Sequence, residues 1–204
     1  KLYSIIDVET TGGKFNQEGI TEIAIYKFDG KKIIDQFISL VNPEIPIQQY
    51  VQNLTGINNK MLRNAPKFFQ IAKRILEITE DTILVAHNSS FDYRMLKIEF
   101  KRLGFDFLIS QICTVKLSKK LIPNKDSYKL GNLVKSLGIP ISNRHRAAGD
   151  AMATVELFRL LLSKDKKRKI ISQLIKTKSL EKKNKFSDIT ENLENVSGLY
   201  YLHN

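Results

Sequence analysis

Hydrophobic and polar positions follow two different rhythms along this chain. Short apolar runs rich in β-branched residues are typical of buried strands, and apolar residues spaced three and four apart are typical of helices packed on a core. The predicted strands are Leu2–Val8, Gly19–Phe28, Lys32–Val41, Thr82–Ala86 and Gln111–Thr114. The predicted helices are Gln48–Leu54, a segment that begins at Pro66, a segment from Ser89 or Ser90 to Gly104, Lys129–Leu137 and Ala147–Ser163.

The order of these elements indicates a fold class. Three strands come first, and Asp29-Gly30 between the second and the third is a hairpin signal. The later strands alternate with helices, as in proteins whose sheets contain parallel strands. We therefore predict an α/β fold with a mixed five-stranded sheet flanked by helices. Residues 1–164 form the predicted domain, and residues 165–204 differ in texture and are predicted to be a basic tail or linker.

Composition restricts where the protein acts. Hydrophobic residues make up 42% of the 204, which is enough for a substantial core. No apolar run reaches the roughly 18 residues that a membrane span requires, so we predict no membrane partner. The single cysteine, Cys113, excludes an internal disulfide and fits a reducing compartment. These features predict a cytoplasmic location.

The chain carries a large positive charge. It has 33 Lys and Arg against 21 Asp and Glu, a formal net charge of +12 that favours binding to polyanions such as nucleic acid. A generally lysine-rich composition is the simpler explanation. One basic stretch could follow a phosphate backbone or form an ordinary solvated face; it comprises Lys116, Lys119, Lys120, Lys125 and Lys129.

Asp7 and Glu9 are the first candidates for chemistry. Residues two apart in a strand point to the same side, so this pair places two carboxylates together at the end of an apolar strand. Adjacent buried anions repel each other, and a divalent cation with oxygen ligands would remove the conflict. A solvated strand end is the alternative that these two residues leave open.

Two helices supply further inward-facing acids. Asp92 lies in the first turn of its helix after a buried strand, and Asp150 shares the apolar stripe of the last strong helix with Thr154 and Leu157. Negative charge is also tolerated at helix N-termini for purely structural reasons. Four inward acids would be balanced by two divalent cations, and two cations about 3.5–4 Å apart are the known device for in-line displacement at a phosphodiester.

His145 completes the candidate site. It lies five residues before Asp150 in a polar loop, where an imidazole could take the proton from an attacking water. A histidine in such a loop is otherwise simply solvated. His87 follows a predicted strand, and for this residue we predict a structural role.

Three segments together resemble a known family. They are residues 7–12 (DVETTG), residues 87–92 (HNSSFD) and residues 145–150 (HRAAGD). In this order and spacing they resemble the DnaQ-like, or DEDDh, 3′–5′ exonucleases, which include the proofreading epsilon subunit of bacterial DNA polymerase III. The resemblance covers about residues 2–163 and implies a ribonuclease-H-like fold.

The resemblance also implies roles for individual residues. Asp7, Glu9, Asp92 and Asp150 would be catalytic and would bind two Mg²⁺ or Mn²⁺ ions per site, and His145 would be the general base. The implied substrate-binding residues are Thr10, Thr11, Leu54 and Asn88. The implied substrate is a single-stranded 3′ end, with DNA favoured over RNA, in proofreading or repair. An RNA-trimming exonuclease and a non-catalytic nucleic-acid-binding domain are the alternatives.

The end of the chain carries a separate resemblance. Residues 192–201 (NLENVSGLYY) resemble the opening of the GIY-YIG nuclease domain of the repair protein UvrC. This resemblance implies that the predicted tail includes the start of a truncated GIY-YIG domain. We therefore expect the partners to be nucleic acid together with a polymerase or a fused UvrC-like domain. An ordinary tail that ends in aromatic residues is the alternative.

Overall fold

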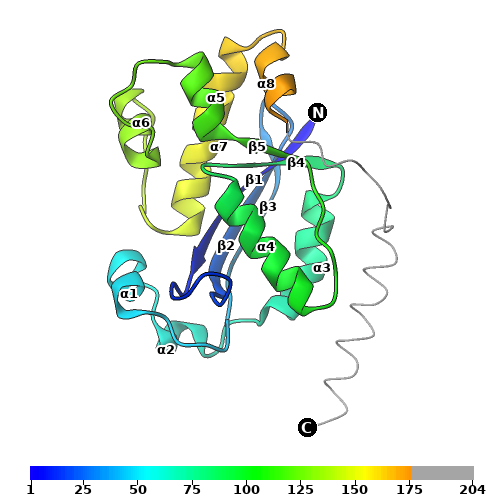
Figure 1. Ribbon diagram of the computed structural model, residues 1–204, viewed down its shortest axis with the longest axis vertical. Coiled ribbons are helices and arrows are strands. Elements are labelled where there is room, and N and C mark those ends of the chain that lie inside the picture. The colour runs from blue at the N-terminus through cyan, green and yellow to red at the C-terminus, as the bar shows by residue number, and fades with distance from the viewer. Residues whose placement is uncertain (176–204) are drawn as a thin grey trace.

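The computed structural model describes residues 1–175, which form a sheet with helices on both faces (Figure 1). The strands are β1 (Leu2–Thr10), β2 (Ile20–Phe28), β3 (Ile33–Leu40), β4 (Thr82–Ala86) and β5 (Gln111–Cys113). The helices are α1 (Gln49–Thr55), α2 (Asn59–Leu62), α3 (Phe68–Thr79), α4 (Ser90–Arg102), α5 (Thr114–Leu121), α6 (Leu130–Ser136), α7 (Ala147–Lys164) and α8 (Lys169–Leu174). Among these helices, none is both long enough and apolar enough to cross a membrane.

The sheet has the strand order β3-β2-β1-β4-β5. The first three strands form an antiparallel meander, whereas β4 pairs in parallel with β1, and β5 with β4. The prediction of a mixed five-stranded α/β fold is therefore confirmed. The strand β1 lies at the centre, and its partner β4 stops early, because their pairing ends at Ile5 and Val85. The last part of β1 therefore has a neighbouring strand on one side only.

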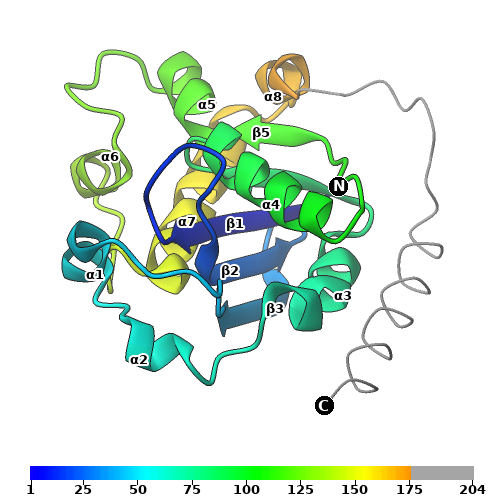
Figure 2. The same cartoon turned by 60° about the horizontal axis from the view of Figure 1, so that its bottom comes forward.

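Two hydrophobic cores lie on opposite faces of the sheet. The first contains buried residues of α3 and α4, and the second contains those of α5, α6, α7 and α8. Figure 2 shows α4 and α7 on opposite sides of β1. Alternate residues of β1 enter the two cores: Ile6 and Val8 pack in the first, and Ile5 in the second. Asp7 and Glu9 share the parity of Ile5, so they emerge on the face that α7 covers.

The structure corrects some local predictions. The lysine-rich segment after β5, to which we assigned no helix, forms α5, because Thr114, Leu117 and Ser118 are buried at helical spacing behind exposed lysines. The helix α2 has only four residues, too few for a period to show. We expected Ser89 or Ser90 to cap α4 with its side chain, but the residue at the cap position, Ser89, makes no such bond. Ser89 adopts helical backbone angles and donates its hydroxyl to Gln111 Oε1 at 3.3 Å instead.

Residues beyond the predicted domain end continue the packed fold. The carboxylate of Asp165 is buried and accepts hydrogen bonds from the backbone amides of Lys169 (3.1 Å) and Ile171 (2.8 Å). These bonds hold the start of α8, and Ile171 packs in the second core. The domain boundary stays a prediction. The segment that resembles a GIY-YIG domain, residues 192–201, lies outside the described residues.

Candidate active site

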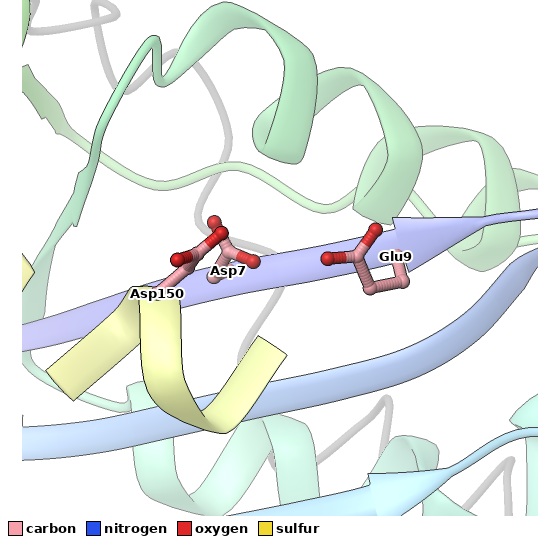
Figure 3. Close-up of side chains that lie close together, drawn as sticks. All are labelled: Asp7, Glu9 and Asp150. Atoms are coloured by element: carbon pink, nitrogen blue, oxygen red, sulfur yellow. The ribbon is translucent and has the colours of Figure 1, made fainter. Parts of the chain in front are cut away.

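Three carboxylates converge where β1 passes the first turn of α7. Oxygen atoms of Asp7, Glu9 and Asp150 all lie within 4.8 Å of one another. Figure 3 shows the two strand acids on one side of β1, facing Asp150 from α7. The convergence follows from two periodicities. Strand alternation puts Asp7 and Glu9 on one face, and the buried stripe of α7, which continues through the fully buried Thr154, turns Asp150 toward the sheet.

Asp92 lies beside this group but is held differently. It is buried in the first turn of α4, and its Oδ1 accepts a hydrogen bond from the backbone amide of Val8 at 3.2 Å. That amide lies in the part of β1 that extends past the end of β4, so the carboxylate replaces a strand partner. Asp92 is absent from the group of three whose oxygens lie within 4.8 Å. Its charge nevertheless acts on Asp7.

The electrostatics of the site are unfavourable for four ionised acids. Burial, followed by the charges of Asp92, Glu9 and Asp150, raises the pKa of Asp7 well above its usual range. Burial is also the main cause that raises the pKa of Glu9 to about 7, with the charge of Asp150 next. Burial raises the pKa of Asp92 to about 7. Burial also raises the pKa of Asp150, and the guanidinium of Arg144 opposes that effect.

This donor set fits a hard divalent cation. All of its ligand atoms are carboxylate oxygens, which Mg²⁺ and Mn²⁺ prefer. Burial and mutual repulsion raise the pKa values of Asp7 and Glu9, so their charged forms are unfavourable without a counter-charge. A bound cation would supply that counter-charge.

The loop before α7 packs tightly against the helix that it precedes. A Cβ atom on Gly149 would lie 2.1 Å from the backbone oxygen of Ser142 and 2.6 Å from that of Asn143, so only glycine allows this approach. The loop places the backbone amide of His145 3.3 Å from Asp150 Oδ2, to which it donates. His145 is partly exposed and has a left-handed backbone with φ of 62°. The candidate base is thus held next to the acidic group by its own main chain.

Sequence reasoning missed an ion pair that fixes the start of α7. Arg146 donates from Nη2 to Glu22 Oε1 at 2.6 Å and from Nε to Glu22 Oε2 at 3.0 Å. The backbone amide of Ala147 donates to the same carboxylate at 2.8 Å. Glu22 lies on β2 directly opposite Glu9, and its side chain is only 4% exposed. Arg146 and Ala147 lie between His145 and Asp150 in the sequence, so these bonds to Glu22 attach the start of α7 to the sheet next to both residues.

The four predicted substrate-binding residues lie in different surroundings. Thr11 is buried, and its hydroxyl donates to Gly12 O and accepts from Gly19 N, so it holds the loop after β1 together. Thr10 is only partly buried. Leu54 projects from α1 with 52% exposure, an uncommon position for a large apolar side chain. The fourth, Asn88, lies at the rim of a pocket.

This pocket has a volume of about 620 Å³ and lies between the end of β4, α5 and the start of α6. Its lining includes His87, Asn88, Lys119, Tyr128 and Lys129. The Nζ atom of Lys119 lies 5.7 Å from the centroid of the Tyr128 ring. His87 uses both ring nitrogens to join the walls, with Thr114 Oγ1 at 2.9 Å and the carbonyl of Tyr128 at 2.8 Å. The pocket therefore combines two lysines, one acid (Asp126), an aromatic ring and a rigid wall.

Comparison with known proteins agrees with this geometry. The family model RNase_T, described as an exonuclease, matches residues 4–158. The chain belongs to this exonuclease family. The three segments 7–12, 87–92 and 145–150, which contain the candidate acids and His145, all lie inside the matched range. The described fold and its acidic site are therefore those of an exonuclease-family domain.

Relatives and solved structures extend the comparison. The chain is 36% identical over 162 residues to a PolC-type DNA polymerase III of Caldanaerobacter subterraneus subsp. tengcongensis, covering 79% of this chain and 12% of that protein. It is 34% identical over 166 residues to the 3′-5′ exonuclease DinG of Staphylococcus aureus, covering 81% of this chain and 18% of that protein. The chain thus spans less than a fifth of the length of either relative.

Among solved structures, exonuclease X in complex with 5′-overhanging duplex DNA is 30% identical, with a TM-score of 0.66. The alignment covers 80% of this chain and 93% of that one. The nuclease domain of 3′hExo, described as a DEDDh family member, has a TM-score of 0.70 at 21% identity and shares the fold. That alignment covers 80% of this chain and 92% of the 3′hExo chain.

Proposed function

We propose that this domain removes nucleotides one at a time from the 3′ ends of DNA, with two divalent cations, Mg²⁺ or Mn²⁺, in the acidic site. The observation that carries the proposal is the convergence of Asp7, Glu9 and Asp150 within 4.8 Å, in a chain of the exonuclease family. Asp92 is the fourth proposed ligand, acting through a bridging water. When bound, the cations stabilise the negative charge that develops on the phosphate oxygens.

The proposed reaction is the hydrolysis of one phosphodiester bond. The oxygen of a water molecule attacks phosphorus, and the bond between phosphorus and the 3′ oxygen of the preceding nucleotide breaks. His145 takes a proton from the attacking water, and the departing 3′ oxygen receives a proton from solvent. The products are a nucleoside 5′-monophosphate and a shortened strand with a 3′ hydroxyl. The backbone of His145 is already fixed to Asp150 by a 3.3 Å hydrogen bond, which supports its role as the base.

The proposed strand follows the basic pocket toward the acids. Lys119 and Lys129 would contact backbone phosphates, and Tyr128 supplies an aromatic surface for a base. Leu54, exposed on α1, would pack against the terminal base, and Thr10, the residue after Glu9 at the end of β1, would lie near the terminal nucleotide. A single strand suits this arrangement because its bases are free to stack on side chains.

We propose DNA as the preferred substrate because two of the similar proteins at 30% identity or more are named or solved with DNA. One is a PolC-type DNA polymerase III, and the other is exonuclease X, which was solved in complex with duplex DNA. An exonuclease that recognises a histone mRNA stem-loop matches at 19% identity, which supports the fold alone. A polymerase, or a fused domain like that of UvrC, remains the proposed protein partner in a cytoplasmic setting. Because all four acids are present, a binding domain without activity is the weaker proposal.

Matched DNA and RNA oligonucleotides of one sequence, labelled at the 5′ end, test this function. In Mn²⁺ or Mg²⁺ we expect a ladder of products shortened from the 3′ end, faster for DNA, and no products in EDTA. Asp7→Ala should abolish the ladder, whereas Asp106→Ala, an exposed acid elsewhere, should not change it. Degradation by the Asp7→Ala variant would refute the assigned site, and faster RNA cleavage would refute the DNA preference.

The role of His145 needs a separate measurement. His145→Ala should keep the Mn²⁺ affinity of the wild-type chain, measured by calorimetry, because no proposed ligand is lost. Its kcat should fall by about 10²- to 10⁴-fold, the usual contribution of a positioned general base. An unchanged kcat would exclude His145 as the base.

A further inference from the structure

Arg144 is a charged residue that contacts the acidic site but has no role in the mechanism proposed above. Its Nη1 lies 3.5 Å from Asp150 Oδ1, and its side chain is 37% exposed. On its other side the guanidinium packs on Gly131 in the first turn of α6. A Cβ atom at Gly131 would lie 2.9 Å from Arg144 Cζ and 3.1 Å from Nη1. The guanidinium therefore occupies space that only glycine leaves open.

Two glycines in the first turns of α6 and α7 border this position. Gly149 of α7 lets the backbone of the loop approach at Ser142, and Gly131 of α6 lets the guanidinium approach. The residues on either side of Arg144, Asn143 and His145, have left-handed backbones with φ of 50° and 62°. The backbone is thus left-handed on both sides of Arg144, and its guanidinium packs against Gly131.

The two arginines that flank His145 differ in what they bind. The guanidinium of Arg146 is committed to the buried Glu22 through Nε and Nη2. Within residues 1–175, Arg144 makes one side-chain hydrogen bond, and its length of 3.5 Å is long for a charge-assisted bond. Most of its five N–H donors therefore have no protein acceptor in the described part of the chain.

We propose that Arg144 is a further catalytic residue, whose guanidinium binds non-bridging oxygens of the scissile phosphate. The proposal rests on the function proposed above. A cation at Asp150 would weaken the attraction of that carboxylate for Arg144 and leave the guanidinium to the phosphate. A planar guanidinium can donate two parallel hydrogen bonds to a phosphate, and such donors stabilise the charge that develops as water attacks. The proton transfer and the bond changes stay as described above.

A simpler role for Arg144, as a counter-ion for Asp150, makes the opposite prediction. If Arg144 only neutralised Asp150, it would compete with the cation, and its removal would strengthen Mn²⁺ binding while turnover by the loaded enzyme stayed the same. If it binds the phosphate, turnover falls although Mn²⁺ binding is kept. Measuring both quantities on one variant therefore separates the two roles.

The experiment uses the full chain and the p-nitrophenyl ester of thymidine 5′-monophosphate. This substrate has one nucleotide and one phosphodiester bond, so it reports the reacting centre without the strand pocket. The variants are Arg144→Ala, Arg144→Lys and Gly131→Ala, whose new Cβ would displace the guanidinium. The control is Arg159→Ala, an exposed arginine farther along α7. Mn²⁺ affinity is measured by calorimetry without substrate.

We expect Arg144→Ala to lower kcat/KM by about 10²- to 10³-fold, the usual loss when one such donor is removed. Mn²⁺ affinity should be equal to that of the wild type or higher, Arg144→Lys should recover only part of the activity, and Gly131→Ala should behave like a weaker Arg144→Ala. Added guanidinium ion should raise the activity of Arg144→Ala but not that of the wild type.

Unchanged turnover of Arg144→Ala would overturn this role and leave the proposed function intact. So would a loss of Mn²⁺ binding that accompanies the loss of activity, because that result indicates a structural role. A wild-type chain that hydrolyses neither this ester nor DNA would overturn the proposed function, and the role of Arg144 with it.

Discussion

Glu9→Gln should make the metal-free protein more stable while abolishing its activity. In the absence of a cation, the ionised carboxylate of Glu9 lies partly buried beside Asp7 and Asp150. Glutamine keeps the shape of the side chain and removes the charge. The variant loses a proposed ligand, so it should hydrolyse no DNA, yet it should resist unfolding better than the wild type in EDTA.

The magnitude follows from the pKa of Glu9. Burial and neighbouring charges raise this pKa from 4.5 to about 7. At 1.36 kcal/mol per pH unit, the ionised group therefore destabilises the fold by about 3 kcal/mol. The pKa of Glu9 is higher in the folded state than in the unfolded state. The free energy of unfolding of the wild type therefore decreases as the pH rises from 4.5 through 7. The penalty is complete at pH 8 and falls to about 1 kcal/mol at pH 5.

Urea unfolding in EDTA at pH 5 and pH 8 measures the effect. We expect Glu9→Gln to exceed the wild type by about 2–3 kcal/mol at pH 8 and by less than about 1 kcal/mol at pH 5. Glu80→Gln, at an exposed acid, is the matched control and should change neither value. Mg²⁺ should stabilise the wild type at pH 8 and so narrow the difference. A variant that is less stable than the wild type at pH 8, or equally improved at both pH values, would refute the reasoning.

Three further substitutions have distinct expected outcomes. Gly149→Ala should lower kcat by at least about tenfold, measured with labelled DNA, because its Cβ would lie 2.1 Å from Ser142 O and displace the His145 loop; wild-type kcat would contradict this. Glu22→Ala leaves the guanidinium of Arg146 unpaired and should lower the free energy of unfolding by about 2 kcal/mol in urea. Leu54→Ala should change stability by less than about 0.5 kcal/mol yet raise KM for single-stranded DNA; an unchanged KM would remove its proposed contact.

Much of the fold was predictable because its elements are periodic. The strand β4 was predicted with its observed bounds, Thr82–Ala86, since a short apolar run between polar turns has few other interpretations. The alternation of β1 correctly placed Asp7 and Glu9 on one face, and the stripe of α7 turned Asp150 inward. What escaped prediction was local. The hydrogen bonds of Ser89 and the short helix α2 depend on backbone angles that no period records.

The missed parts of the site depend on contacts between distant segments. Glu22 on its own is one acid in an apolar strand, and only the sheet register and the fold bring Arg146 to it. The packing of Arg144 against Gly131 likewise requires contact between α6 and the loop before α7. Nothing in the spacing of these residues indicates the contacts. Periodicity and the family resemblance both indicated the acids, but neither indicated Glu22, Arg146 or Gly131.

The wide separation along the chain of the segments that form the acidic site affects how the protein matures. Asp7 and Glu9 are made first, yet Asp150 reaches them only when α7, late in the described chain, packs against β1 and β2. A partly synthesised chain therefore has no assembled centre, and a folding intermediate without α7 should cut nothing. Recovery of hydrolysis during refolding should then coincide with the docking of α7, and its loss on heating should mark the first release of that helix.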